Sequence, residues 1–237
     1  MGMKVPVGEA MRYLGAPETD AGTRAMVEEM ATILEEQVTP RYVYRVAPIR
    51  WLSGAEKSGA EAEDGGAGRE KGELDGTGVR LTGTLARRML EECDAAALMA
   101  CTLGAGFERL LRAWEVRDMA RAAVLDACGS AYVEAGCDAA EEEIRTRCAG
   151  KYLTDRFSPG YGDLPLELQG TILEALDGGR RLGLQATESW LLNPAKSVTA
   201  IIGLSEKPQG AKIRGCAVCG LRDHCAYRER GTRCVLE

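Results

Sequence analysis

Hydrophobic residues at helical spacing mark the first forty residues of the chain. Residues 8–14 predict a short helix, and Asp20 is a suitable N-cap for a second one. In the second helix, apolar side chains recur every three or four residues, at Ala25, Met26, Met30, Ile33 and Leu34. Pro40 ends this helix, and the aromatic and β-branched run at 41–46 predicts a strand.

The rest of the chain predicts more helices than strands. Helices are expected at 84–92, 107–114, 118–135, 138–152 and 166–176, and the largely apolar run at 94–103 predicts a buried strand. Two further strands are expected at 184–192 and 197–204, on either side of a turn at 193–196. Because the helices cluster in the middle and the strands lie toward both ends, the pattern predicts an α+β fold, a twisted antiparallel sheet with peripheral helices.

One segment, 53–78, departs from this periodicity. Glycine and charged residues dominate it, and seven acidic residues against three basic ones give it a net charge of −4. Leu74 is its only large aliphatic residue. Such a composition buries too little apolar surface to offset the entropy of ordering, so we expect a disordered acidic insertion within a domain at 1–206. The remaining residues, 207–237, form a separate cysteine-rich tail.

Composition excludes several classes of protein. With 237 residues, 45% of them hydrophobic and 28% charged, the chain is expected to be globular. It has no run of about 18 apolar residues and no signal-peptide pattern, which predicts a cytoplasmic protein without a membrane span. A net charge of −6 argues against a nucleic-acid-binding domain, and the single histidine, His224, argues against Ser-His-Asp or Cys-His catalysis.

The segment Arg156-Phe157-Ser158-Pro159-Gly160-Tyr161-Gly162-Asp163 has the most distinctive chemistry. Proline and two glycines favour a tight backbone with accessible amides. Arg156 offers a planar fork for a carboxylate, and Tyr161 offers a ring face for a cation or a base. Together they suit a small zwitterion that carries an aromatic or sulfonium group. The alternative is a structural turn with a surface ion pair.

The motifs around this loop resemble a known family. Arg-x-x-Pro-Gly-Tyr at 156–161 is followed by Leu-Gly-Leu-Gln-Ala-Thr-Glu-Ser at 182–189 and Pro-Ala-Lys-Ser-Val at 194–198. This ordered set is similar to the activation domain of cobalamin-dependent methionine synthase, most clearly over 152–203. The short motifs Tyr-Leu-Gly at 13–15 and Thr-Leu-Gly at 102–104 resemble free-standing relatives of that domain.

The resemblance implies an activation-domain fold that binds S-adenosylmethionine. In the family, the arginine of this motif meets the methionine carboxylate, and the following loop and its tyrosine complete the pocket. Carried over, these residues are Arg156, Ser158, Gly160 and Tyr161. The family also uses acidic residues of the preceding helices for the amino and ribose groups, and we assign Glu134 to this role. A solvated helix carboxylate is the alternative for Glu134.

The chain departs from the family in ways that bear on function. Ser158 replaces the usual alanine, and the corrinoid-binding Asp-x-His-x-x-Gly motif is absent. Any cobalamin must therefore arrive on a partner, either a corrinoid protein or modules of a methionine synthase. The resemblance then implies a component of a methyltransferase system that reactivates that cobalamin by reductive methylation.

The tail contains four cysteines, Cys216, Cys219, Cys225 and Cys234, spaced C-x2-C-x5-C-x8-C. This spacing is typical of metal binding and fits zinc or an iron–sulfur cluster. Seven basic residues against three acidic ones give 207–237 a net charge of +4, which suits docking of an acidic electron carrier such as flavodoxin or ferredoxin. The five cysteines outside the tail are most simply small core residues.

Two other functions remain open on the sequence. The chain could be a non-catalytic module that binds S-adenosylmethionine or a corrinoid protein and holds a structural zinc in its tail. It could also bind nucleic acid through a zinc knuckle, although the net charge of −6 and the lack of aromatics interleaved in the basic tail disfavour this. The identity of the metal distinguishes this non-catalytic module from a redox role: an iron–sulfur cluster supports a redox role, whereas zinc, which carries no electrons, supports the module.

Overall fold

The computed structural model describes residues 2–17, 19–52, 71–213 and 224. Within these ranges, six strands form one antiparallel sheet in the order β3-β2-β1-β4-β8-β5. The strands are β1 (Arg41–Leu52), β2 (Lys71–Leu74), β3 (Arg80–Leu81), β4 (Ala95–Thr102), β5 (Tyr152–Leu153) and β8 (Ser197–Ser205). A second, two-stranded sheet pairs β6 (Gln185–Ala186) with β7 (Leu192–Asn193). The antiparallel α+β fold expected from the sequence is confirmed.

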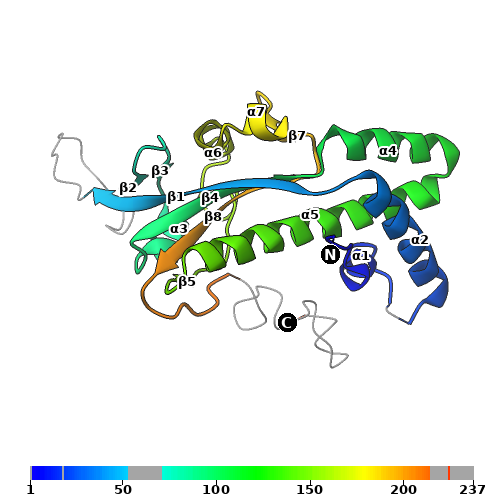
Figure 1. The fold of residues 1–237 in the computed structure, drawn as a ribbon, viewed down its shortest axis with the longest axis horizontal. Coiled ribbons are helices and arrows are strands. Elements are labelled where there is room, and N and C mark those ends of the chain that lie inside the picture. The colour runs from blue at the N-terminus through cyan, green and yellow to red at the C-terminus, as the bar shows by residue number, and fades with distance from the viewer. Residues whose placement is uncertain (1, 18, 53–70, 214–223, 225–237) are drawn as a thin grey trace.

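Helices cover both faces of the large sheet. They are α1 (Val7–Tyr13), α2 (Ala21–Gln37), α3 (Thr84–Leu90), α4 (Gly104–Arg117), α5 (Met119–Arg147), α6 (Leu168–Leu176) and α7 (Gly178–Leu182). Figure 1 shows α5 running along one face of the sheet, with α6 and α7 on the other. None of the helices in the described ranges is long and apolar enough to span a membrane.

Strand β4 is covered on both faces, which explains why its sequence is apolar from Ala95 to Cys101. Side chains alternate between the two faces of a strand. Met99 and Cys101 belong to the core under α1, α2, α4 and α5, whereas Leu98 and Ala100 belong to the core under α3 and α6. All four are fully buried. The strand lies between β1 and β8 with helices on both sides, so it is buried from Ala96 to Thr102.

Helix α5 is one continuous helix, and the prediction of two helices at 118–135 and 138–152 was wrong. The suspected break contains Gly136, where a Cβ atom would lie 2.7 Å from both the Cys101 Sγ and the Pro40 Cβ. Glycine therefore lets α5 approach the sheet closely, and the packing outweighs its low helix propensity. The chain leaves the helix after Arg147 and forms β5, which the sequence did not predict.

Two other expectations need correction. Residues 71–78 were expected to belong to a disordered insertion, yet they form β2 and the turn that follows it, because Leu74 is fully buried and β2 pairs with β1. The rest of that expected insertion, 53–70, lies outside the described residues. The single strand expected at 184–192 is instead the hairpin of β6 and β7, with Trp190 between them in the left-handed region at φ 63°.

The cysteines of the described ranges behave as core residues, as expected. Cys93, Cys101, Cys128 and Cys137 are buried, and Cys148 is half-buried. Burial raises the pKa of Cys128 to about 12 and that of Cys93 to about 11. Because the thiolate is the reactive form of cysteine, these two side chains are structural and inert near neutral pH.

Candidate functional site

The loop 156–163 leaves the edge of the large sheet immediately after β5. Phe157 exchanges two backbone hydrogen bonds with Ile201 of β8, its N–H donating at 3.0 Å and its carbonyl accepting at 2.8 Å. Its ring is fully buried in the core on the α3 and α6 face. Because neighbouring residues of an extended segment point to opposite faces, Arg156 is directed to the other face of the sheet, toward α5.

Arg156 lies at the centre of three carboxylates from α5. Its Nη2 donates to Glu134 at 2.5 Å, and its Nη1 donates to Asp138 at 2.6 Å and to Glu141 at 3.0 Å. Positions 134, 138 and 141 follow the spacing of one helix face. The Arg156 side chain is 5% exposed, whereas that of Asp138 is 68% exposed. Arg156 and these three carboxylates sum to a charge of −2, and Arg145, which pairs with Glu141 at 3.3 Å, offsets part of it.

Electrostatics keep this guanidinium charged. Burial by itself lowers the pKa of Arg156, but Cys137, Glu134 and Asp138 raise it by a larger amount, and the net shift is upward. Removing the charge would leave three carboxylates without their shared cation, which is costly for partly buried groups. The sequence predicted Arg156 and Glu134 as site residues, and the structure brings them into direct contact.

The loop from Ser158 to Leu164 is closed by its own backbone. The N–H of Tyr161 donates to the Ser158 carbonyl at 3.1 Å, and the N–H of Gly160 donates to the Leu164 carbonyl at 2.9 Å. Gly160 has a φ of 89°, in a region that favours glycine. The Tyr161 side chain is exposed. The expectation of accessible amides is thus wrong for Gly160 and Tyr161, whose N–H groups close the turn.

Asp163 fastens the far end of the loop to α3. Its carboxylate accepts hydrogen bonds from the N–H of Thr84 at 2.5 Å, the hydroxyl of Thr84 at 2.8 Å and the N–H of Leu85 at 2.9 Å. It therefore caps the N-terminus of α3 from a distant part of the chain. A Cβ at Gly83 would lie 2.8 Å from the Asp163 Cγ, so the close approach needs glycine there.

This anchor makes the stability of the protein depend on pH in a predictable direction. Hydrogen bonds from the Leu85 and Thr84 backbone lower the pKa of Asp163 from 3.8 to about 2. A depressed folded pKa means that the ionised group stabilises the fold above its ordinary pKa, and that this contribution is lost as pH falls toward 2. We expect Asp163→Asn to flatten the fall in thermal unfolding midpoint between pH of about 4 and about 2. Glu115→Gln, at an exposed carboxylate of α4, should leave the acid limb unchanged. A wild-type slope in Asp163→Asn would contradict the anchor.

Sequence reasoning missed three residues of this neighbourhood. Asp138 and Glu141 bind Arg156 directly, and their spacing from Glu134 would have revealed them had α5 been predicted as continuous. Tyr13, at the end of α1, is 45% exposed, and Arg12 stacks on its ring at 4.7 Å. Burial is the larger cause of the raised pKa of Tyr13, and the negative charge of Glu134 is the second. Tyr13 therefore interacts electrostatically with this carboxylate.

The predicted metal site is not tested by the structure. Cys216, Cys219, Cys225 and Cys234 lie outside the described residues. Among the residues that are described, no group of three or more histidine, cysteine, aspartate or glutamate side chains is arranged to hold a metal ion.

Comparison with solved structures identifies the fold. The chain superimposes on a crystal structure of the MetH reactivation domain bound to AdoHcy with a TM-score of 0.57. The match covers 94% of this chain and 77% of that chain, at 18% sequence identity. This chain has the fold of the MetH reactivation domain. No family model matches the sequence, and neither does any curated protein. The fold implied by the motifs at 156–198 is therefore confirmed.

Proposed function

We propose that this protein binds S-adenosylmethionine at the Arg156 cluster and supports reductive methylation of a corrinoid carried by a partner protein. The observation that carries the proposal is the buried Arg156 guanidinium among three carboxylates, next to a tight loop that exposes Tyr161. The MetH reactivation domain, which has the same fold, is seen with AdoHcy bound. The reactivation role itself is an inference from the motifs at 156–198.

The charges of the cluster suit this ligand. Arg156 and its three carboxylates sum to −2, whereas S-adenosylmethionine combines a carboxylate with an ammonium and a sulfonium for a net charge of +1. S-adenosylhomocysteine lacks the sulfonium charge. Electrostatic attraction at a partly buried site therefore favours the methyl donor over its product.

Each side chain has a distinct task in this proposal. Arg156 would bind the ligand carboxylate through its fork once Asp138 turns outward, which its 68% exposed side chain permits. Glu134, at 39% exposure, would accept a hydrogen bond from the ligand ammonium. Tyr161 would lie against the sulfonium or the adenine. Gly160 would contact the ligand through its carbonyl, because its N–H is engaged with Leu164, and Ser158 would do so through its N–H, because its carbonyl accepts from Tyr161.

No protein nucleophile or general base is needed for the reaction. S-adenosylmethionine supplies an electrophilic methyl group, and the reduced corrinoid substrate supplies the electron pair, so that S-adenosylhomocysteine and a methylated corrinoid result. One electron from an external donor, such as flavodoxin or ferredoxin, reduces the inactive corrinoid first. The protein contributes binding and orientation, which is the usual division of labour between a protein and a cofactor.

Methyl transfer to chemically reduced cobalamin tests this function. We expect the protein to accelerate the transfer of label from [methyl-¹⁴C]S-adenosylmethionine to cobalamin at least tenfold over the protein-free rate, because it holds the donor in one orientation. Tyr161→Ala should remove most of the acceleration and leave the fold intact, since this side chain is exposed. An identical rate with and without protein would contradict the proposed methylation role.

We also propose that Cys216, Cys219, Cys225 and Cys234 bind zinc or an iron–sulfur cluster. The support is their spacing in the sequence. Metal analysis of anaerobically purified protein, with the visible absorption spectrum, tells the two apart, because only the cluster absorbs in the visible range and accepts electrons.

A further inference from the structure

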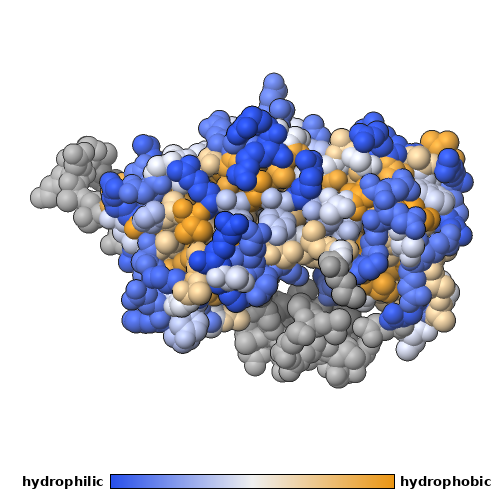
Figure 2. All heavy atoms as spheres, in the orientation of Figure 1, coloured by the Kyte–Doolittle hydropathy of each residue, from blue (hydrophilic) through white to orange (hydrophobic). Residues whose placement is uncertain are grey.

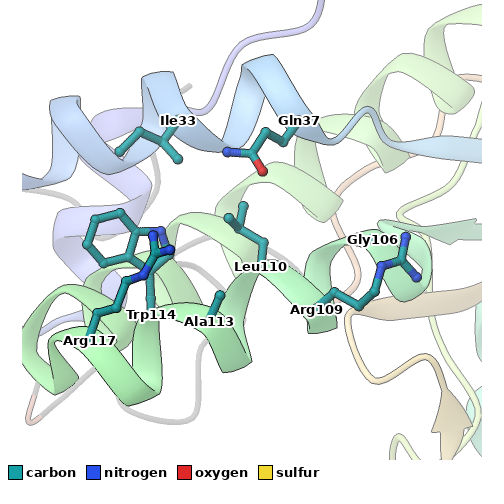
Figure 3. A pocket seen from close by; sticks show the side chains of 8 residues that line it. All are labelled: Ile33, Gln37, Gly106, Arg109, Leu110, Ala113, Trp114 and Arg117. Carbon is teal, nitrogen blue, oxygen red and sulfur yellow. The ribbon is translucent and has the colours of Figure 1, made fainter.

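A second candidate site lies between α2 and α4 and shares no lining residue with the Arg156 cluster. A groove with a volume of about 540 Å³ separates these helices. Figure 3 shows Ile33 and Gln37 of α2 above it and Leu110, Ala113 and Trp114 of α4 below it. Gly106, Arg109 and Arg117 complete the lining at the same face of α4. The lining residues of α4 therefore follow one face of the helix over three turns, and Leu110 at the floor of the groove belongs to the core.

The middle of the groove is apolar. Ile33, Leu110, Ala113 and Trp114 contribute hydrocarbon and an indole ring, and the polar lining residues stand at its margins. Beside it, at the corner between α4 and α5, Val116 is 90% exposed and Met119 is 66% exposed. Figure 2 shows hydrophobic side chains surfacing among hydrophilic ones at this end of the molecule. Exposed apolar surface rimmed by polar groups is typical of a protein interaction site.

The polar groups of the groove are cationic. Arg109 and Arg117 are exposed, and within the described ranges neither guanidinium forms an ion pair. The nearby Arg121 contrasts with them, because it is paired with Glu29 and Asp118 and lies over the Trp114 ring at 5.9 Å. Among the residues that the structure describes, no carboxylate lines the groove. A ligand for this site must therefore present anionic groups and an apolar surface together.

The distance between Arg109 and Arg117 sets a minimum length for a ligand that contacts both side chains. They are eight residues apart on α4, which corresponds to about 12 Å along the helix axis. A small dianion is too short to meet both guanidinium groups. A helix with acidic residues seven or eight positions apart and apolar residues between them matches both the cationic ends and the apolar middle.

We propose that the groove between α2 and α4 docks an acidic amphipathic helix of a partner protein. The charge of the whole chain, −6, makes the local positive charge at Arg109 and Arg117 decisive for this docking, since an acidic partner is repelled elsewhere. The site shares no residue with the Arg156 cluster, so the proposal does not depend on S-adenosylmethionine binding.

Fluorescence anisotropy with designed helical peptides tests the proposal. The probe is a labelled, stapled 16-residue peptide with two glutamates seven positions apart and leucines between them; the comparison peptide carries glutamines in their place. We expect the glutamate peptide to bind with Kd below about 100 µM and the glutamine peptide at least tenfold more weakly, which is about 1.4 kcal/mol. Salt should weaken the first far more than the second.

Arginine variants inside and outside the groove show whether the peptide binds in the groove. Arg109→Gln with Arg117→Gln should weaken binding of the glutamate peptide at least tenfold, whereas Arg112→Gln, on the outer side of the same helix, should change it less than twofold. All three side chains are exposed, so the fold is retained. The proposal is overturned if the wild type fails to bind the peptide at about 1 mM. It is also overturned if Arg112→Gln matches the double variant, or if succinate displaces the peptide at equal concentration.

Discussion

Replacement of Arg156 by lysine is expected to weaken binding of S-adenosylmethionine at least tenfold, about 1.4 kcal/mol. Lysine retains the positive charge but loses the planar fork, so a ligand carboxylate can no longer be held by two parallel hydrogen bonds. The variant should remain folded, with a stability loss of about 1–2 kcal/mol, because a charge still faces Glu134, Asp138 and Glu141. Calorimetric titration with the ligand, combined with thermal unfolding, measures both quantities.

The matched control for this variant is Arg145→Lys. Arg145 also forms an ion pair with Glu141 of the cluster, at 3.3 Å, but its side chain is 50% exposed and we assign it no contact with the ligand. Its replacement should alter ligand affinity less than twofold. Equal affinities for wild type and Arg156→Lys would show that Arg156 only stabilises the fold, which is the structural alternative for this residue.

Phe157→Ala is expected to destabilise the protein by about 3–5 kcal/mol. The ring of Phe157 is fully buried, and its backbone ties the loop to β8 through two hydrogen bonds with Ile201. Truncation removes buried hydrocarbon and leaves a cavity beside the loop that carries Arg156 and Tyr161. For a chain of this size, such a loss lowers the unfolding midpoint by about 6–20 °C. Urea unfolding followed by circular dichroism gives the free energy directly.

Comparison of Phe157→Ala with Tyr161→Ala distinguishes a residue that supports the loop from a residue that contacts the ligand. Tyr161 is 54% exposed, so its truncation should cost less than about 0.5 kcal/mol in stability. The stability effect should therefore be large at position 157 and small at position 161, while both variants lose ligand affinity. If Phe157→Ala cost less than about 1 kcal/mol, the loop would not depend on this anchor.

The sequence predicted the three central strands of the large sheet, β1, β4 and β8, and much of the helical layer. Strand β4 was recognisable because it is buried on both faces and hence apolar from Ala95 to Cys101. Strand β2 was missed because glycine and charged residues surround its one buried aliphatic side chain, Leu74. Its stability comes from pairing with β1, which a local pattern does not contain. The break predicted near Gly136 was also wrong because of a tertiary contact. Glycine is needed at this position because Cys101 and Pro40, which are distant in the sequence, pack against the helix there.

The candidate site was predicted in part. The motif at 156–161 identified Arg156 and Tyr161, and the resemblance to activation domains led to Glu134. Asp138 and Glu141 were missed although they share its helix face, because α5 was divided at Gly136 in the prediction. The groove between α2 and α4 was beyond prediction, because the sequence of α4 does not reveal which helix lies opposite.

The measurement that tests the central claim most directly is calorimetric titration of the anaerobically purified wild-type protein, first with S-adenosylmethionine and then with S-adenosylhomocysteine. The charge of −2 around Arg156 predicts saturable binding of both, with the methyl donor bound more tightly and its advantage reduced by salt. Absence of binding by S-adenosylmethionine at millimolar concentration would contradict the account. So would an affinity that is unchanged when Arg156 is replaced by lysine.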